Sequence, residues 1–374
     1  MTAVRPPGTG RRRLALAAVS VLGALAALEG ACRYEAHRRN QGAMDVAFSA
    51  ERVLEQGGRV ALIDILRASD HEDVVFELKP GLSGVPFKGV PLSTDRHGFR
   101  GPERTVAPGP DTVTVLGLGD SVMFGHGVGD GLPYLDVLEK GLRRRHPQRA
   151  WRVINTAVPA YNTVQELATL RAKGLAHQPD LVILGLVGND LVLPRYVRVV
   201  EDVFDLSRSF LWEQLSARLG DDGLERHGFA LNEGRDPRLV HHQAVSTSRE
   251  VPEAYRHLVG WEPFTAALEE LDRLSDEHGF EVLVVTVIEH GAEQMLEYIS
   301  RYDWPLVRMR PVIQRELGAG GEVATGPVDL DAYLRSDLVV NASDAHPSAR
   351  LHFLIAQELL RALEQNGLIE ALSR

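Results

Sequence analysis

The sequence predicts an α/β protein built on a central, mostly parallel β-sheet. From Asp111 onward, short apolar runs alternate with helix-like stretches, which is the pattern of a parallel sheet with crossover helices. One of these runs, from Leu181 to Leu186, is continuously apolar, as expected for a strand that is buried on both faces. Between Val60 and Asp111 prolines recur, so this stretch predicts loops and short strands rather than a separate domain.

Each expected element has its own signal, either a short apolar run for a strand or a longer amphipathic stretch for a helix. In chain order these are a strand at Thr112–Leu118, a helix at Tyr134–Arg145, a strand at Arg152–Asn155, a helix at Val164–Ala176, a strand at Leu181–Leu186, a helix at Phe264–Glu277, a strand at Glu281–Val287 and a final helix at Ala349–Gln365. The polar stretch at about 191–260 breaks the alternation, and we expect it to form an insertion over the strand ends.

Length and composition exclude several classes of protein. A chain of 374 residues predicts one main domain of about 200 to 250 residues with attached segments. The formal net charge of -10 argues against a nucleic-acid binder. A single cysteine, Cys32, excludes an internal disulfide framework and a site with several cysteine ligands.

The amino-terminal segment has the pattern of an export signal or of a single membrane anchor. Arg11–Arg13 precede an apolar run from Leu14 to Leu28, after which Glu29 returns the chain to water. This run fits a signal-peptide core and is short for a full span, which residues 30–32 would extend if Glu29 snorkels to the interface.

We therefore expect residues 1–32 to be an uncleaved anchor at the cell membrane, with the rest of the chain on the extracytoplasmic side. A cleaved signal peptide, giving a secreted or periplasmic protein, stays open as the alternative. Residues 33–110 are then expected to form a stalk and an N-terminal extension. Residues 111–370 are expected to form the main domain, with the insertion inside it.

Polar side chains follow three of the expected strands, and a histidine lies near the carboxyl terminus. Ser121 follows the first strand in Gly119-Asp120-Ser121, a loop at 155–162 follows the second, and Asn189 follows the third in Gly188-Asn189-Asp190. Open α/β sheets bind their ligands at such strand ends. Near the carboxyl terminus, His346 is a candidate base and Asp344 a candidate partner for its second ring nitrogen. Together these groups are what acyl transfer to water requires.

In this order the motifs resemble those of the SGNH hydrolases, also called the GDSL-type esterase and lipase superfamily, over roughly Asp111 to Asn366. Gly119-Asp120-Ser121 with Gly125 resembles the first block, Gly188-Asn189-Asp190 the third and Asp344-Ala345-His346-Pro347 the last. The stretch at 97–103 is similar to one in membrane-anchored bacterial members. The resemblance implies a three-layer α/β/α sandwich of the flavodoxin-like kind.

The resemblance also implies a role for each site residue. Ser121 would be the nucleophile, His346 the general base and acid, and Asp344 the group that orients it. The backbone N–H groups of Ser121 and Ala160 and the side chain of Asn189 would form the oxyanion hole.

The chain departs from the family pattern in the second block and in the last. Ala157 and Ala160 stand where the family has glycine, and alanine resists a positive φ. Asp344 precedes His346 by two residues, whereas a spacing of three is commoner.

These features imply an exported serine hydrolase that cleaves carboxylic esters through an acyl-enzyme, without a metal or an organic cofactor. The expected substrate is a small-molecule or glycan ester, such as acetyl groups on cell-envelope polysaccharide. A polysaccharide O-acetyltransferase with the same triad and a catalytically silent glycan-binding member are the alternatives.

Other polar residues near the motifs have simpler interpretations. Asp120 and Asp190 are expected to bond within their own turns. His126 lies between two glycines, and the sequence leaves open whether it contacts substrate or faces solvent. His241 and His242 do not predict a metal site, because adjacent residues of a strand point to opposite faces.

Overall fold

A computed structural model describes residues 9–40, 59–103, 109, 111–198, 202–219, 236, 239–241, 251, 253–318 and 326–372. The chain divides into two compact units. The first, here called the helical unit, consists of Met1–Ala47 and Arg198–Arg238. The second, here called the sheet unit, consists of Phe48–Val197 and Leu239–Arg374.

Within the described residues, the sheet unit is built on a five-stranded sheet with the order β11-β10-β7-β5-β6. Its strands are β5 (Thr112–Leu118), β6 (Ala150–Asn155), β7 (Leu181–Leu186), β10 (Glu281–Thr286) and β11 (Leu306–Arg308). Every neighbouring pair is parallel, which confirms the predicted α/β class. The chain passes from β5 to β6 on one side and then to β7 on the other, so a topological switch point lies beside β5.

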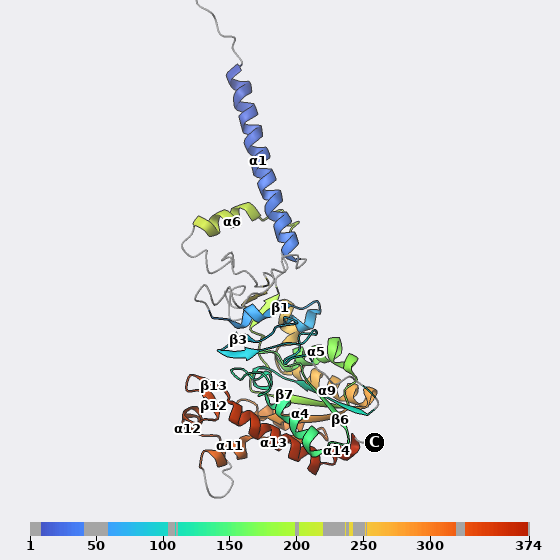
Figure 1. Cartoon of the computed structure of the whole chain (residues 1–374). Coiled ribbons are helices and arrows are strands. Elements are labelled where there is room, and N and C mark those ends of the chain that lie inside the picture. The colour runs from blue at the N-terminus through green and yellow to red at the C-terminus, as the bar shows by residue number, and fades with distance from the viewer. Residues whose placement is uncertain are drawn as a thin grey trace, which may run out of the picture. The chain divides into compact units, whose positions relative to one another are not determined.

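Helices cover both faces of this sheet (Figure 1). On one face, Leu181 and Ile183 of β7 share a core with residues of α4 (Tyr134–Arg145) and α13 (Ala349–Gln365). On the other, Val182 and Leu184 share a core with residues of α5 (Thr163–Thr169) and α9 (Trp261–His278). Alternate residues of one strand therefore face opposite helical layers, and the architecture is the expected three-layer α/β/α sandwich.

Residues 62–92 supply the first short strands of the sheet unit. β1 (Leu66–Ala68) pairs with β2 (Phe76–Leu78), and β3 (Val85–Phe87) pairs with β4 (Val90–Leu92), both antiparallel. Buried side chains of this segment, including Ile65, belong to the same core as α4 and α13. This part of the extension therefore packs into the sheet unit.

The other described elements of the chain are mostly short. They are the 3-10 turns Leu62–Ile65, Glu72–Val74, Leu175–His177 and Glu253–Leu258, a π-helical turn Leu170–Gly174, the helices α3 (Ser121–Phe124), α10 (Glu293–Ile299), α11 (Arg310–Glu316), α12 (Leu330–Arg335) and α14 (Leu368–Ala371), and the strands β8 (Tyr196–Arg198), β9 (Leu239–His241), β12 (Val339–Asn341) and β13 (Asp344–Pro347). β12 and β13 form an antiparallel pair.

The helical unit contains the long helix α1 (Thr9–Asn40) and the helix α6 (Phe210–Leu219). By length and composition, the Arg13–Arg38 part of α1 is able to cross a membrane. The apolar run predicted from the sequence lies inside this helix.

Candidate active site

Ser121 lies at the carboxyl end of β5, at the start of α3. Asp120 caps this short helix, because its Oδ1 accepts a hydrogen bond from the backbone N–H of Val122 at 2.9 Å. Gly125 ends α3 in the left-handed conformation with a φ of 82°, which glycine adopts without steric cost. The strand, turn and helix together hold the Ser121 side chain at the edge where α/β sheets bind ligands.

Ser121, His346 and Asp344 form a continuous chain of hydrogen-bonding groups. The Oγ of Ser121 lies 2.9 Å from Nε2 of His346, and Nδ1 of His346 lies 2.6 Å from Oδ1 of Asp344. Asp344 and His346 both belong to β13, and residues two apart in a strand face the same side. The two-residue spacing therefore suits a direct contact between the carboxylate and the ring.

The charge of Asp344 follows from its surroundings. Burial opposes its ionisation, but hydrogen bonds from His346 and the positive charge of that ring outweigh burial and hold the pKa of Asp344 below its ordinary value. The Nζ of Lys88 lies 3.6 Å from Oδ2 of Asp344. Lys88 stands in the turn between β3 and β4 with a φ of 54°. Sequence reasoning missed Lys88, because no motif links this turn to Asp344.

His126 packs directly against His346. The two ring centroids are 4.4 Å apart with 29° between the planes, and His126 is only 8% exposed. Burial above all, together with the positive charges of His346 and Lys88, lowers the pKa of His126 to about 4. The ring of His126 is therefore neutral at pH 7. Of the two interpretations left open by the sequence, exposure to solvent is wrong.

Asn155, at the end of β6, holds the turn that carries Ser121. Its Nδ2 donates a hydrogen bond to the carbonyl oxygen of Met123 in α3 at 3.0 Å, and its Oδ1 accepts one from the backbone N–H of Ala157 at 3.1 Å. Asn155 is fully buried. One side chain thus ties α3, the helix that begins at Ser121, to the loop that carries the predicted backbone donor Ala160.

A cavity of about 480 Å³ lies beside Ser121 and His346. Its lining comes from the turn after β5, the loop after β7, the segment after β10 and the segment around β13. The lining residues are Asp120, Ser121, Val122, Val187, Gly188, Asn189, Ile288, His290, Ser343, Asp344, Ala345 and His346. Asn189 is exposed at this cavity, so its amide has access to a bound molecule.

Ala160 is not among the residues that line this cavity. It has a φ of 73°, in the left-handed region that glycine occupies more readily than alanine. This is the conformation that alanine resists, at a position where the family resemblance has glycine. Val158 of the same loop donates its N–H to the carbonyl oxygen of Gly119, which follows β5, at 3.2 Å.

Gly188 lies where two backbones meet. A methyl group at this position would overlap the carbonyl oxygen of His290, so only glycine fits between the end of β7 and the segment after β10. The next residue but one, Asp190, accepts a hydrogen bond from the backbone N–H of Val187 at 2.9 Å. Asp190 therefore bonds within its own turn, as the sequence predicted, and this turn presents Asn189.

The carboxyl groups of Asp120, Asp190 and Glu166 are buried and close enough to influence one another's ionisation. Burial raises the pKa of each, and the charges of Asp190 and Asp120 raise that of Glu166 further. Neither side-chain oxygen of Glu166 has a hydrogen-bond partner among the described residues. Burial of a carboxyl group without such a partner disfavours its ionised form.

One group of side chains in the described residues has the proximity that a metal ion needs. Ligand atoms of His126, Asp344 and His346 lie within 4.8 Å of one another. Both ring nitrogens of His346 already face other groups, Nε2 the Oγ of Ser121 and Nδ1 the carboxylate of Asp344. His242 of the histidine pair lies outside the described residues.

Comparison with solved structures finds proteins of the class that the sequence motifs resemble. One, from Desulfitobacterium hafniense DCB-2, is described as belonging to the lipolytic G-D-S-L family. It has 13% identity and a TM-score of 0.38, with 67% of this chain and 99% of the other covered. A catalytic mutant of an acetylxylan esterase from Geobacillus stearothermophilus has 14% identity and a TM-score of 0.39, with 70% and 96% covered.

A two-domain esterase active on acetylated mannans has 17% identity and a TM-score of 0.34, with 68% of this chain and 49% of the other covered. The comparison with protein-family models gives no match. The comparison with curated proteins gives none either.

Proposed function

We propose that this chain is a serine hydrolase of the SGNH type that cleaves carboxylic esters. The observation that carries the proposal is the hydrogen-bonded series from Ser121 through His346 to Asp344 beside a cavity of about 480 Å³. A hydroxyl next to a ring whose other nitrogen is held by a carboxylate is arranged for nucleophilic attack.

The reaction proceeds in two half-reactions. Nε2 of His346 takes the proton of Ser121 as Oγ bonds to the ester carbonyl carbon, and the carboxylate of Asp344 stabilises the imidazolium that forms. His346 then gives this proton to the departing alcohol, which leaves an acyl group on Ser121. Water attacks the acyl carbon with His346 again as base, which releases the acid and restores the hydroxyl.

The oxyanion formed in each half-reaction needs preorganised donors. The proposal assigns this role to the exposed amide of Asn189 and to the backbone N–H groups of Ser121 and Ala160. A donor of this kind lowers the barrier by about 3 kcal/mol. Asn189 is supported by its place in the cavity lining, whereas Ala160 is assigned from the family resemblance.

The proposed substrates are short acyl esters, in particular acetyl groups on glycans of the cell envelope. Small apolar groups of Val122, Val187 and Ala345 line the cavity with Ser121, and the polar side chains of His290 and Ser343 are available to sugar hydroxyls. The proposed location is the cell membrane, with α1 as a single anchor. Arg11–Arg13 before the apolar run would stay in the cytoplasm, which puts the sheet unit outside.

The experiment is hydrolysis of p-nitrophenyl acetate by the full chain in detergent. Ser121→Ala and His346→Ala are each expected to lower kcat by about 10³-fold or more. His257→Ala, which changes an exposed histidine, is the matched control and should retain full activity. Equal turnover in the wild type and in both site variants would contradict the proposal. Acetyl transfer to an added methyl glycoside in place of water would identify a transferase.

A further inference from the structure

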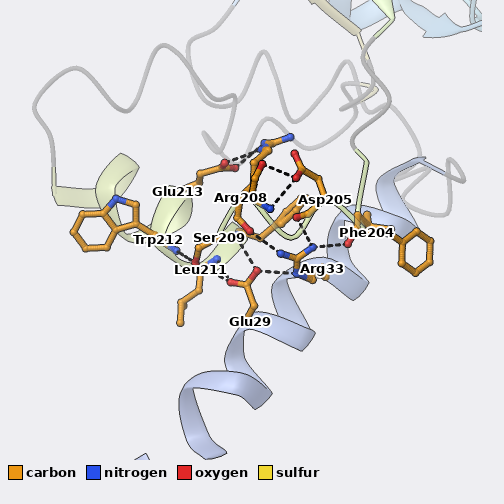
Figure 2. Close-up of polar contacts among 12 residues, drawn as sticks. Glu29, Arg33, Phe204, Asp205, Arg208, Ser209, Leu211, Trp212 and Glu213 are labelled. Carbon is orange, nitrogen blue, oxygen red and sulfur yellow. Dashed lines mark hydrogen bonds and ion pairs between the residues drawn. The ribbon is translucent and has the colours of Figure 1, made fainter. Parts of the chain in front are cut away.

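The segment 202–219 of the predicted insertion is tied to the anchor helix by polar contacts at two residues of α1 (Figure 2). Glu29 accepts hydrogen bonds from the Oγ of Ser209 at 3.0 Å and from the backbone N–H groups of Phe210 and Leu211 at 3.0 and 2.8 Å. Free N–H groups at a helix start need acceptors. The carboxylate of Glu29 therefore caps the N-terminus of α6.

Arg33, one turn further along α1, binds the loop that leads into α6. Its guanidinium donates to the carbonyl oxygens of Val203 and Arg208 at 2.6 Å each and to that of Asp205 at 3.1 Å. It also donates to Glu29 at 2.8 Å. The ring of Phe210 is 2% exposed and lies 4.9 Å from the Arg33 guanidinium carbon. Glu29 and Arg33 thus neutralise each other and fix the segment.

The position of these contacts along α1 corresponds to a membrane boundary. A hydrocarbon core of about 30 Å takes about 20 helical residues. Counted from Leu14, the first residue of the apolar run, such a span ends near Arg33. The apolar run itself stops at Leu28, so Glu29 and Arg33 lie in the last turns of the span. A neighbouring segment with apolar side chains would supply the apolar surface that α1 lacks in these turns.

Segment 202–219 has such side chains, and they are exposed in the described protein. Phe204 is 82% exposed, Leu206 91%, Trp212 66% and Leu215 41%. Figure 2 shows the rings of Phe204 and Trp212 projecting away from α1 on opposite sides. Tryptophan and phenylalanine with this exposure are typical of residues at the interface between lipid and water.

We propose that segment 202–219 lies in the membrane interface and anchors the protein beside α1. Phe204, Leu206, Trp212 and Leu215 enter the boundary between headgroups and acyl chains, and Glu29 and Arg33 hold the segment at this depth. The inference rests on the proposed membrane anchorage by α1. The segment carries both acidic and basic residues, Asp202, Asp205 and Glu213 with Arg208 and Arg218, so apolar insertion rather than attraction to anionic lipid provides the affinity.

The test uses the full chain in phosphatidylcholine vesicles that contain lipids brominated at a shallow acyl position. The chain has 4 tryptophans, and Trp151, Trp261 and Trp304 belong to the sheet unit. The fluorescence difference between the wild type and Trp212→Phe isolates Trp212. We expect the fluorescence of Trp212 to be quenched by the brominated lipid and to be protected from aqueous acrylamide. Trp304→Phe is the control and should leave the lipid-quenched part of the fluorescence unchanged.

A second variant tests the tie to α1. Glu29→Ala removes the cap of α6. The ratio of lipid-inserted to water-exposed Trp212 is then expected to fall about fivefold, which corresponds to the loss of one helix cap. Quenching of Trp212 by acrylamide alone would overturn the proposal. Protection of Trp212 from both quenchers would overturn it in favour of a contact with a second copy. p-Nitrophenyl acetate hydrolysis on the same vesicles reports separately on the proposed esterase.

Discussion

At the scale of single residues, Ala160 has a backbone conformation that alanine resists. It has a φ of 73°, which costs an alanine about 1 kcal/mol relative to glycine. Ala160→Gly keeps the backbone N–H and removes this strain. We expect the free energy of unfolding in guanidinium to rise by at most about 1 kcal/mol, since the gain is offset by the greater freedom of glycine in the unfolded chain, with esterase activity retained.

A fall in stability and in activity for Ala160→Gly would contradict this account of the loop. It would mean that the methyl group of Ala160 makes contacts that outweigh the backbone strain.

Asn155 gives a second prediction at this scale. Asn155→Ala leaves the buried carbonyl of Met123 and N–H of Ala157 without their partners, which costs about 2 kcal/mol or more. Because α3 then loses its tie to the loop, kcat should fall about tenfold or more. Asn155→Asp is the matched variant, since it keeps an acceptor for Ala157, and should be intermediate in the same unfolding and kinetic assays. Wild-type kcat in Asn155→Ala would exclude this positioning role.

At the scale of elements, local patterns in the sequence predicted most of the sheet and its helices. β5, α4 and α13 have the predicted bounds, because a buried run or a clear amphipathic period defines each. The predicted helix at 164–176 begins at Thr163, after the cap Asn162, and changes to π and 3-10 turns from Leu170. β11 was not predicted, since a strand of three residues gives no periodic signal.

The residues of the candidate site fall into two groups, those that the sequence predicted and those that only the structure shows. Ser121, Asn189, Asp344 and His346 stand in local motifs that a reader of the sequence can find. Lys88 and the stacking of His126 on His346 depend on tertiary packing, because the partners come from distant segments. The tie between Glu29 and α6 is of this second kind too, and the sequence suggested only that Glu29 would snorkel.

The helix α5 provides a prediction through its buried Glu166. The pKa of Glu166 is raised in the folded state by burial and by neighbouring carboxylates, whereas an unfolded glutamate titrates near 4.5. The stability that the neutral acid contributes is therefore lost as pH rises through the folded pKa. Glu166→Gln should raise the free energy of unfolding above that of the wild type at pH 9, with the difference shrinking toward pH 5. A constant difference across this range would contradict a neutral Glu166.

At the scale of the whole molecule, we expect buried neutral histidines to lower the stability of the fold in acid. Burial lowers the pKa of His352 to about 3, and its Nδ1 accepts a hydrogen bond from the N–H of Tyr134 at the start of α4 at 3.1 Å. The unfolded chain binds a proton near pH 6.5, whereas the folded chain does not. Stability is thus complete above pH 6.5 and falls as pH drops toward 3.

His352→Asn keeps an acceptor and removes the proton site. The unfolding free energy of His352→Asn should fall less steeply below pH 6.5 than that of the wild type. The two slopes should differ by up to about 1.4 kcal/mol per pH unit. Thermal unfolding followed by near-UV circular dichroism at several pH values measures the slope. The exposed His257→Asn is the control and should keep the wild-type slope; an identical slope in His352→Asn would show that His352 is not buried neutral.

The identity of the acylated residue tests whether Ser121 is the nucleophile. The full chain is mixed rapidly with p-nitrophenyl acetate, quenched in acid within the first turnover, digested and analysed by mass spectrometry. We expect one acetyl group on the peptide that contains Ser121, and none in Ser121→Ala under the same conditions. Turnover with no acetyl group on Ser121, or an acetyl group on another residue that rises and decays with turnover, would contradict this role of Ser121.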